Sequence, residues 1–80
     1  MSRPRKRSLT LRGHATSVSM EAEFWAAFRR IAADRGVSTS ALAAEIDAVR
    51  DLDTGLASAI RVFVLSDLER RLAQRAGGME

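Results

Sequence analysis

Residues 12–40 read RGHATSVSMEAEFWAAFRRIAADRGVSTS, and this stretch decides the fold of the chain. Apolar and small polar residues alternate over residues 15–20, which is typical of a strand with one face on a core. Apolar residues then recur at spacings of three and four, a pattern that predicts a helix. Gly36 can end that helix and Ser38 can cap the next one. The stretch therefore predicts a strand, a helix, a tight turn and a second helix.

The predicted strand over about 15–20 needs a partner, because a lone strand leaves its backbone N–H and C=O groups unpaired. The residues just before it also alternate, but their apolar members, Leu9 and Leu11, fall at odd positions. Val18 and Met20 fall at even positions. One regular strand cannot place both pairs on the same face.

Gly13 lies between these two alternating halves, where a bulge or a turn would place both apolar pairs on the same face. Two arrangements follow. The chain forms a hairpin through Gly13-His14, or it forms a long bulged strand whose second half pairs with another copy of the chain.

Three helices are expected, over about 21–35, 39–50 and 55–74, followed by a frayed end over 76–80. Val49 falls in the apolar register of the second helix, and we expect it to face inward. Leu68 and Leu72 fall in the apolar register of the third helix. The middle of the third helix is apolar nearly all round, which favours a homodimer with this helix in the shared core. The expected dimer core consists of Val18, Met20, Phe24, Phe28, Ile31, Leu42, Ile46, Ile60, Phe63 and Val64.

Composition limits the function further. Eighty residues make one small domain, over residues 8–75, and the chain has no cysteine and a single histidine. These counts argue against a thiolate site, a multi-histidine metal site and a catalytic triad, so we expect no enzyme, no metal and no cofactor. No apolar run is long enough for a signal peptide or a membrane span, and we expect no membrane partner.

Charge is concentrated at the N-terminus. Residues 1–20 carry five basic side chains and no acid, whereas residues 21–80 carry 8 basic and 10 acidic side chains. Residues 1–7 are therefore expected to form a disordered basic arm. Such an asymmetry favours a polyanionic partner, nucleic acid first and an anionic membrane second, over a tail that only improves solubility.

The segments TSVSME (16–21), EFWAAFRRIAADRG (23–36) and GVSTSAL (36–42) resemble the ribbon-helix-helix DNA-binding fold, the Arc and MetJ class of repressors. The match covers residues 15 to about 49. The third helix resembles a bacterial variant of that family with an N-terminal extension. The resemblance implies a mainly α protein with one or two short N-terminal strands that forms an intertwined homodimer with an antiparallel intermolecular β-ribbon.

The resemblance also implies that this ribbon enters the major groove of double-stranded DNA and that the start of the second helix holds phosphate. The side chains on the outer face of the strand are short, which implies modest sequence discrimination. The expected base-facing residues are Ala15, Ser17 and Ser19, together with Arg12 and His14. The expected phosphate contacts are Ser38, Thr39, Ser40, Arg3, Arg5, Lys6 and Arg7.

These expectations describe a small bacterial transcriptional regulator, a repressor that is cytoplasmic and associated with the nucleoid. Two alternatives stay open. One is a protein-interaction module of the same fold, antitoxin-like or a co-regulator, with a protein partner. The other is a binder of RNA or anionic membranes that acts through the basic arm.

Overall fold

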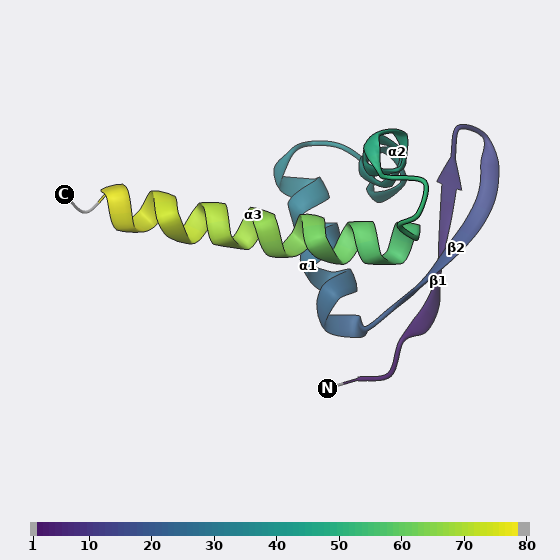
Figure 1. Ribbon diagram of the computed structural model, residues 1–80, viewed down its shortest axis with the longest axis horizontal. Helices are drawn as coiled ribbons and strands as arrows, with labels where there is room; N and C mark the ends of the chain where they lie inside the picture. Colours follow the sequence, from purple (N-terminus) through teal and green to yellow (C-terminus); the bar gives the residue numbers. More distant parts are fainter. Residues whose placement is uncertain (1, 79–80) are drawn as a thin grey trace.

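The computed structural model describes residues 2–78 as a β-hairpin followed by three helices (Figure 1). The expected order of strand, helix, turn and helix is confirmed, with a second strand added before it. The elements are strands β1 (Arg5–Leu11) and β2 (His14–Met20) and helices α1 (Ala22–Asp34), α2 (Thr39–Val49) and α3 (Leu56–Gly78).

The two strands pair antiparallel within one chain, in a register that runs from Arg5 opposite Met20 to Leu11 opposite His14. Arg12 and Gly13 form the turn, with φ angles of 49° and 83°. Two successive positive φ angles are typical of the type I′ turn that closes two-residue hairpins. Of the two arrangements open from the sequence, the chain adopts the hairpin, with its turn one residue earlier than Gly13-His14. Within the single chain, β1 provides the partner that β2 requires.

This hairpin resolves the conflict between odd and even apolar positions. In the observed register each odd residue of β1 lies opposite an even residue of β2. Leu9 therefore shares a face with Val18 and Met20, and all three are buried. The turn reverses the chain direction, and this places the odd apolar residues of β1 and the even apolar residues of β2 on the same face without a bulge.

The N-terminal segment differs from the expected disordered arm over residues 1–7. Residues 5–7 belong to β1, because β2 provides a partner for their backbone groups. The Ser2 hydroxyl accepts a hydrogen bond from the Ala22 N–H at 2.9 Å and donates one to Glu23 at 2.6 Å. Ser2 thus caps α1 from a distance, which replaces the side-chain cap that Glu21 does not make. Residue 1 lies outside the described part of the chain.

The core lies between the inner face of the hairpin and the three helices. Phe28 at its centre is fully buried, and the Phe63 ring meets it edge-on with 6.2 Å between the ring centroids. Phe24 and Phe63 are half-buried at the margin. The other expected core residues are buried within a single chain: Val18, Met20, Phe28, Ile31, Leu42, Ile46, Ile60 and Val64.

Helix α3 departs most from the expectation. It continues to Gly78, although fraying was expected over 76–80, of which 79–80 lie outside the described residues. Its C-terminal half projects beyond the other elements (Figure 1). Val49 on α2 was expected to face inward but is exposed, because no element within residues 2–78 covers it. Leu68 and Leu72 on α3 are also exposed in the single chain.

A buried carboxylate on α3 belongs to a network of ion pairs that reaches the end of α1. Asp67 is 3% exposed and accepts hydrogen bonds from Arg70 at 2.6 Å and from Arg71 at 2.8 Å. Arg71 also pairs with Asp34 of α1 at 3.1 Å, and Arg35 lies 3.7 Å from Asp67. Burial alone would raise the pKa of Asp67, but the arginines outweigh it and hold that pKa below its ordinary value.

Candidate nucleic-acid interface

The outward face of the hairpin is polar and solvent-exposed on both strands. Because side chains alternate along a strand and cross-strand partners share a face, the register defines this face completely. We call it the outer ribbon face. It consists of the pairs Lys6 and Ser19, Ser8 and Ser17, and Thr10 and Ala15, all of them exposed.

The expected base-facing residues divide into two groups. Ala15, Ser17 and Ser19 lie together on the outer ribbon face, as the strand pattern predicted. His14 lies opposite Leu11, on the other face of the hairpin. Arg12 lies in the turn and forms an ion pair with Asp47 of α2, so its guanidinium is turned toward the helix.

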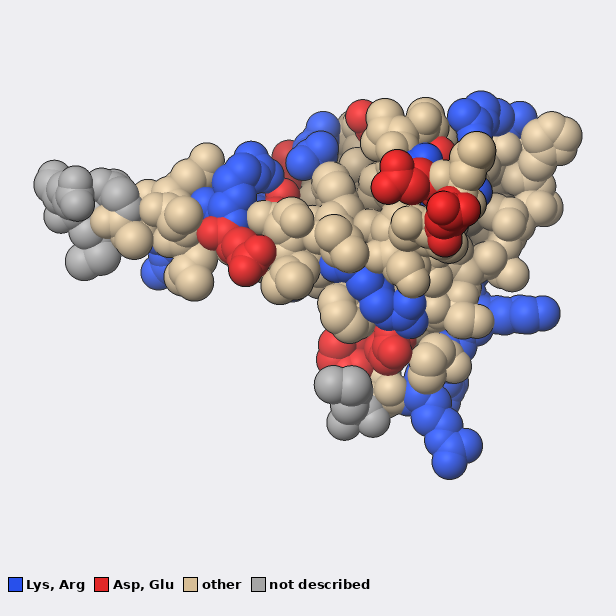
Figure 2. Space-filling view, viewed as in Figure 1, with Lys and Arg blue, Asp and Glu red and all other residues tan. Residues whose placement is uncertain are grey.

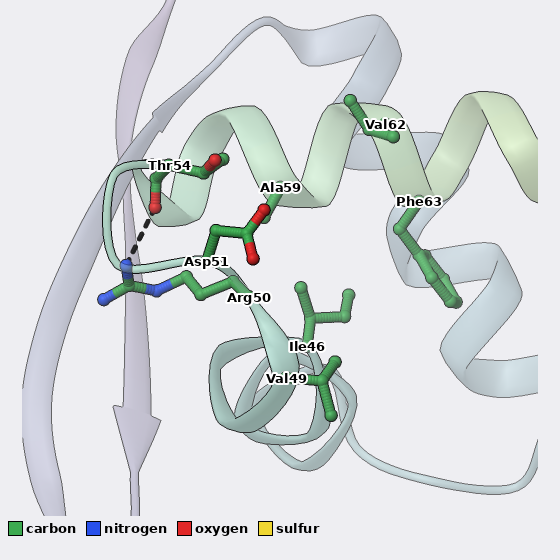
Figure 3. A pocket seen from close by; sticks show the side chains of 8 residues that line it. All are labelled: Ile46, Val49, Arg50, Asp51, Thr54, Ala59, Val62 and Phe63. Atoms are coloured by element: carbon green, nitrogen blue, oxygen red, sulfur yellow. Dashed lines mark hydrogen bonds between the residues drawn. The ribbon is translucent and has the colours of Figure 1, made fainter.

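Asp47 joins the hairpin turn to α2 and to the loop that follows. Its carboxylate also accepts a hydrogen bond from Arg50 at 2.7 Å, and Arg50 donates a second one to the Thr54 carbonyl at 2.8 Å (Figure 3). The Arg50 hydrogen bond, assisted by the charges of Arg50 and Arg12, holds the pKa of Asp47 below its ordinary value. The turn is therefore held against the domain.

The start of α2 lies beside the edge of β1. Ser38 caps the helix by accepting the Ala41 N–H at 2.9 Å, and Ser40 accepts the Thr10 N–H of β1 at 3.0 Å. The first N–H groups of a helix have no partner within the helix, and this end carries partial positive charge. Of the three residues expected to hold phosphate, Ser38 and Ser40 use their hydroxyls in structural hydrogen bonds, and Thr39 is half-buried.

The basic residues of the N-terminal segment fall into two groups, those that are exposed and one, Arg7, that packs back against the domain. Arg3 and Arg5 are exposed, and Lys6 lies on the outer ribbon face. Arg7 folds back, donating a hydrogen bond to the Met20 carbonyl at 3.3 Å with its guanidinium carbon 6.0 Å from the centroid of the Trp25 ring. In Figure 2, basic side chains project on the side where β1 and the N-terminus lie.

Sequence reasoning missed Arg29 and Arg30 as members of this surface. Both are exposed near the end of α1 and line a shallow depression together with Ser38 and Thr39. Neither forms an ion pair with any residue of the described chain. In the sequence the two arginines are explained by the helix dipole alone, and only the α1–α2 turn brings them to the start of α2.

A family model described as a ribbon-helix-helix domain matches residues 4–68. The chain belongs to the ribbon-helix-helix family. The match includes β1 and about half of α3, so the ribbon-helix-helix domain of this chain extends beyond residues 15–49 on both sides. Members of this family are usually DNA-binding regulators or antitoxins. No curated protein and no solved structure gives a significant match.

Within residues 2–78, none of the helices is long and apolar enough to cross a membrane. The same part of the chain contains no cluster of three or more histidine or carboxylate side chains that could hold a metal ion.

Proposed function

We propose that this ribbon-helix-helix protein is a homodimeric DNA-binding protein of modest sequence specificity, and that it acts as a small bacterial transcriptional repressor in the cytoplasm, associated with the nucleoid. It inserts its β-ribbon in the major groove. The observation that carries this proposal is the outer ribbon face, which is mostly polar and exposed and is flanked by basic side chains, Arg3 and Arg5, that form no ion pair within residues 2–78. No catalytic residue is assigned.

The short residues of β2 provide weak base readout. The hydroxyls of Ser17 and Ser19 donate and accept hydrogen bonds, so each fits several base edges. Ala15 adds apolar contact with a thymine methyl group. These three residues therefore position the ribbon in the groove and discriminate little between sequences.

Phosphate contacts provide most of the affinity. Arg3 and Arg5 flank the ribbon at its N-terminal end, and Arg29 and Arg30 lie beside the start of α2. Phosphate is favoured at such a helix start, where Thr39 and its neighbours offer N–H groups. Contacts of this kind make binding depend steeply on salt, because each neutralised phosphate releases counterions.

The homodimer is supported by an apolar groove between α2 and α3. Its walls include Ile46, Val49, Val62 and Phe63 (Figure 3). Val49 is 83% exposed and Val62 is 61% exposed, although both are apolar. Contiguous apolar surface of this kind on a small domain marks an interface. A second copy packed here buries the groove and leaves both hairpins free for DNA.

Light scattering tests the proposal directly. The mass of the protein at low micromolar concentration should be near that of two chains, and it should shift to a dimer–duplex complex when a mixed-sequence duplex is added at low salt. If about six phosphates are neutralised, log K against log salt should slope by roughly −5. A monomer, or a complex that does not weaken with salt, contradicts the proposal.

A second candidate function is a protein-interaction module of the antitoxin or co-regulator kind. It is favoured by the projecting half of α3, where Leu68 and Leu72 are 43% and 69% exposed. A stoichiometric partner protein that remains bound in high salt and is lost in Leu72→Asp supports this function. Binding that is confined to duplex DNA contradicts it.

A further inference from the structure

We propose that Asp47 competes with DNA for Arg12: its carboxylate holds the Arg12 guanidinium in the free protein and releases it to a backbone phosphate in the complex. The inference rests on the proposed DNA-binding function and names a residue that limits its affinity. Arg12 was expected among the base-facing residues, and its ion pair with Asp47 turns it toward α2 instead.

Arg12 occupies a turn position whose backbone does not favour an arginine. Its φ angle is 49°, in the left-handed region, and within residues 2–78 it is the one residue other than glycine with a positive φ. Type I′ turns favour asparagine, aspartate or glycine at this position. Backbone geometry therefore does not explain the arginine, and an outlier of this kind points to a role for the side chain.

Asp47 is held in place by a different arginine. Its Oδ1 atom accepts a hydrogen bond from Arg50 Nε at 2.7 Å, and Arg50 also donates to the Thr54 carbonyl at 2.8 Å. The other carboxylate oxygen, Oδ2, pairs with Arg12. The Arg50 side chain is 30% exposed, whereas that of Arg12 is 60% exposed. Arg12 is thus the partner that can leave, and Asp47 keeps a charged hydrogen bond when it does.

The ion pair lies beside the surface that is proposed to meet DNA. Arg12 and Asp47 line a depression together with Ala15 and Ser17, two residues of β2 that were expected to face bases. A phosphate that approaches this edge of the ribbon therefore meets the Arg12 guanidinium and competes with the Asp47 carboxylate for it.

Phosphate is the stronger competitor. An ion pair between exposed side chains contributes little to stability and is screened by salt. A guanidinium binds phosphate through two parallel hydrogen bonds, and the dense charge of duplex DNA adds to the attraction. Because Asp47 is ionised, with its pKa held below the ordinary value, Arg12 exchanges one anion for another when it binds DNA. Each Arg12 contact therefore adds less affinity than an arginine without an internal partner would add.

The experiment measures the affinity of the full chain for a mixed-sequence duplex by fluorescence anisotropy over a series of salt concentrations. Asp47→Asn removes the competing charge. Asp51→Asn is the matched control, because it removes the same charge from an exposed residue nearby that forms no ion pair within residues 2–78. Both variants are also made in an Arg12→Gln background, and melting temperatures verify that all of them fold.

Asp47→Asn should tighten binding roughly tenfold more than Asp51→Asn does, because a charge-assisted contact then forms without an internal bond being broken. This gain should vanish in the Arg12→Gln background. Arg12→Gln alone should make the slope of log K against log salt shallower by about one per chain, since one phosphate contact is lost. Asp47→Asn should leave that slope unchanged, because the number of phosphate contacts stays the same.

NMR on the wild type provides a test that needs no variant. The side-chain Nε–H signal of Arg12 should shift when duplex is added, and that of Arg50 should stay. The role of Asp47 is overturned, while DNA binding stands, by an Arg12 signal that does not move, by equal gains in Asp47→Asn and Asp51→Asn, or by a gain that persists without Arg12. A wild type that retains no duplex even at low salt overturns the proposed function, and the inference with it.

Discussion

The hydroxyl of Ser40 accepts a hydrogen bond from the backbone N–H of Thr10 at 3.0 Å. This bond joins the first turn of α2 to the edge of β1, two elements that are separated by the whole of α1. The strand edge is thereby capped, and the ribbon and the start of α2 are held in a fixed relation. In the proposed complex that relation sets the distance between base contacts and phosphate contacts.

Ser40→Ala should therefore loosen the hairpin. The loss of one hydrogen bond should lower the free energy of unfolding by about 0.5–1.5 kcal/mol, and the Thr10 amide should exchange with solvent faster. Ser38→Ala, which removes the cap of α2 at a cost of about 1 kcal/mol, is the matched control and should leave Thr10 unaffected. Hydrogen exchange followed by NMR distinguishes the two. An unchanged Thr10 rate in Ser40→Ala would show that the bond does not form in solution.

Ser17→Glu should repel DNA without harming the fold. The side chain is exposed on the outer ribbon face, and surface substitutions of this kind usually change stability by no more than about 0.5 kcal/mol. Thr16→Glu places the same charge one residue away on the opposite face of the hairpin. Duplex affinity, measured by fluorescence anisotropy, should fall much more in Ser17→Glu. Equal losses in both variants would mean that the outer ribbon face does not enter the groove.

Phe28→Ala should destabilise the protein by about 3–5 kcal/mol, because the ring is fully buried and its removal leaves a cavity between α1 and α3. Leu72→Ala, at a position that is 69% exposed, should change the free energy of unfolding by less than about 0.5 kcal/mol. Thermal or urea unfolding measures both. Similar effects of the two substitutions would show that the core is not where the structure places it.

Val49→Asp and Val62→Asp should each prevent self-association, because both side chains line the α2–α3 groove and a buried unpaired carboxylate is costly. Leu72→Asp adds the same charge at the projecting end of α3, where the exposed fraction lies between those of Val49 and Val62, and should leave the dimer intact. Sedimentation velocity gives the masses. If only Leu72→Asp dissociates the protein, the second copy binds along the end of α3 and not in the groove.

Acid should weaken the ion pairs that Asp67 forms with Arg35, Arg70 and Arg71. The pKa of Asp67 lies below its ordinary value of 3.8 in the folded chain, so the ionised carboxylate stabilises the fold. This contribution is fully present above the ordinary pKa and is lost as the pH falls through the depressed one. Asp67→Asn should lower the melting temperature at neutral pH and reduce its fall between pH 5 and pH 2. If the melting temperature of the variant falls as much as that of the wild type between pH 5 and pH 2, other carboxylates cause the fall.

Much of the fold could be predicted because local signals agree with the final packing. The apolar stripe around Phe28 and the left-handed Gly36, with φ of 70°, placed α1 and its end near the observed positions. The beginning of β1 could not be predicted in this way. Arg5 and Arg7 contribute no apolar periodicity, and their place in a strand depends on pairing with β2.

The candidate site was predictable where it follows from strand alternation alone, as for Ser17 and Ser19. Residues whose roles depend on tertiary partners were not. Arg12 is drawn away by Asp47, which lies 35 residues further along the chain. Arg29 and Arg30 join the surface only because the turn at Gly36 brings the end of α1 next to the start of α2.

The alternation of the hairpin separates its positions into two independent sets. Substitutions at Lys6, Ser8 or Ser17 change the surface offered to a partner and leave the core packing of Leu9 and Val18 untouched. A single-residue insertion in β1 would instead exchange the two sets and expose the core. The length of the hairpin is therefore tightly constrained while its outer composition is free to drift, and new binding preferences are accessible to this scaffold through point substitutions without loss of stability.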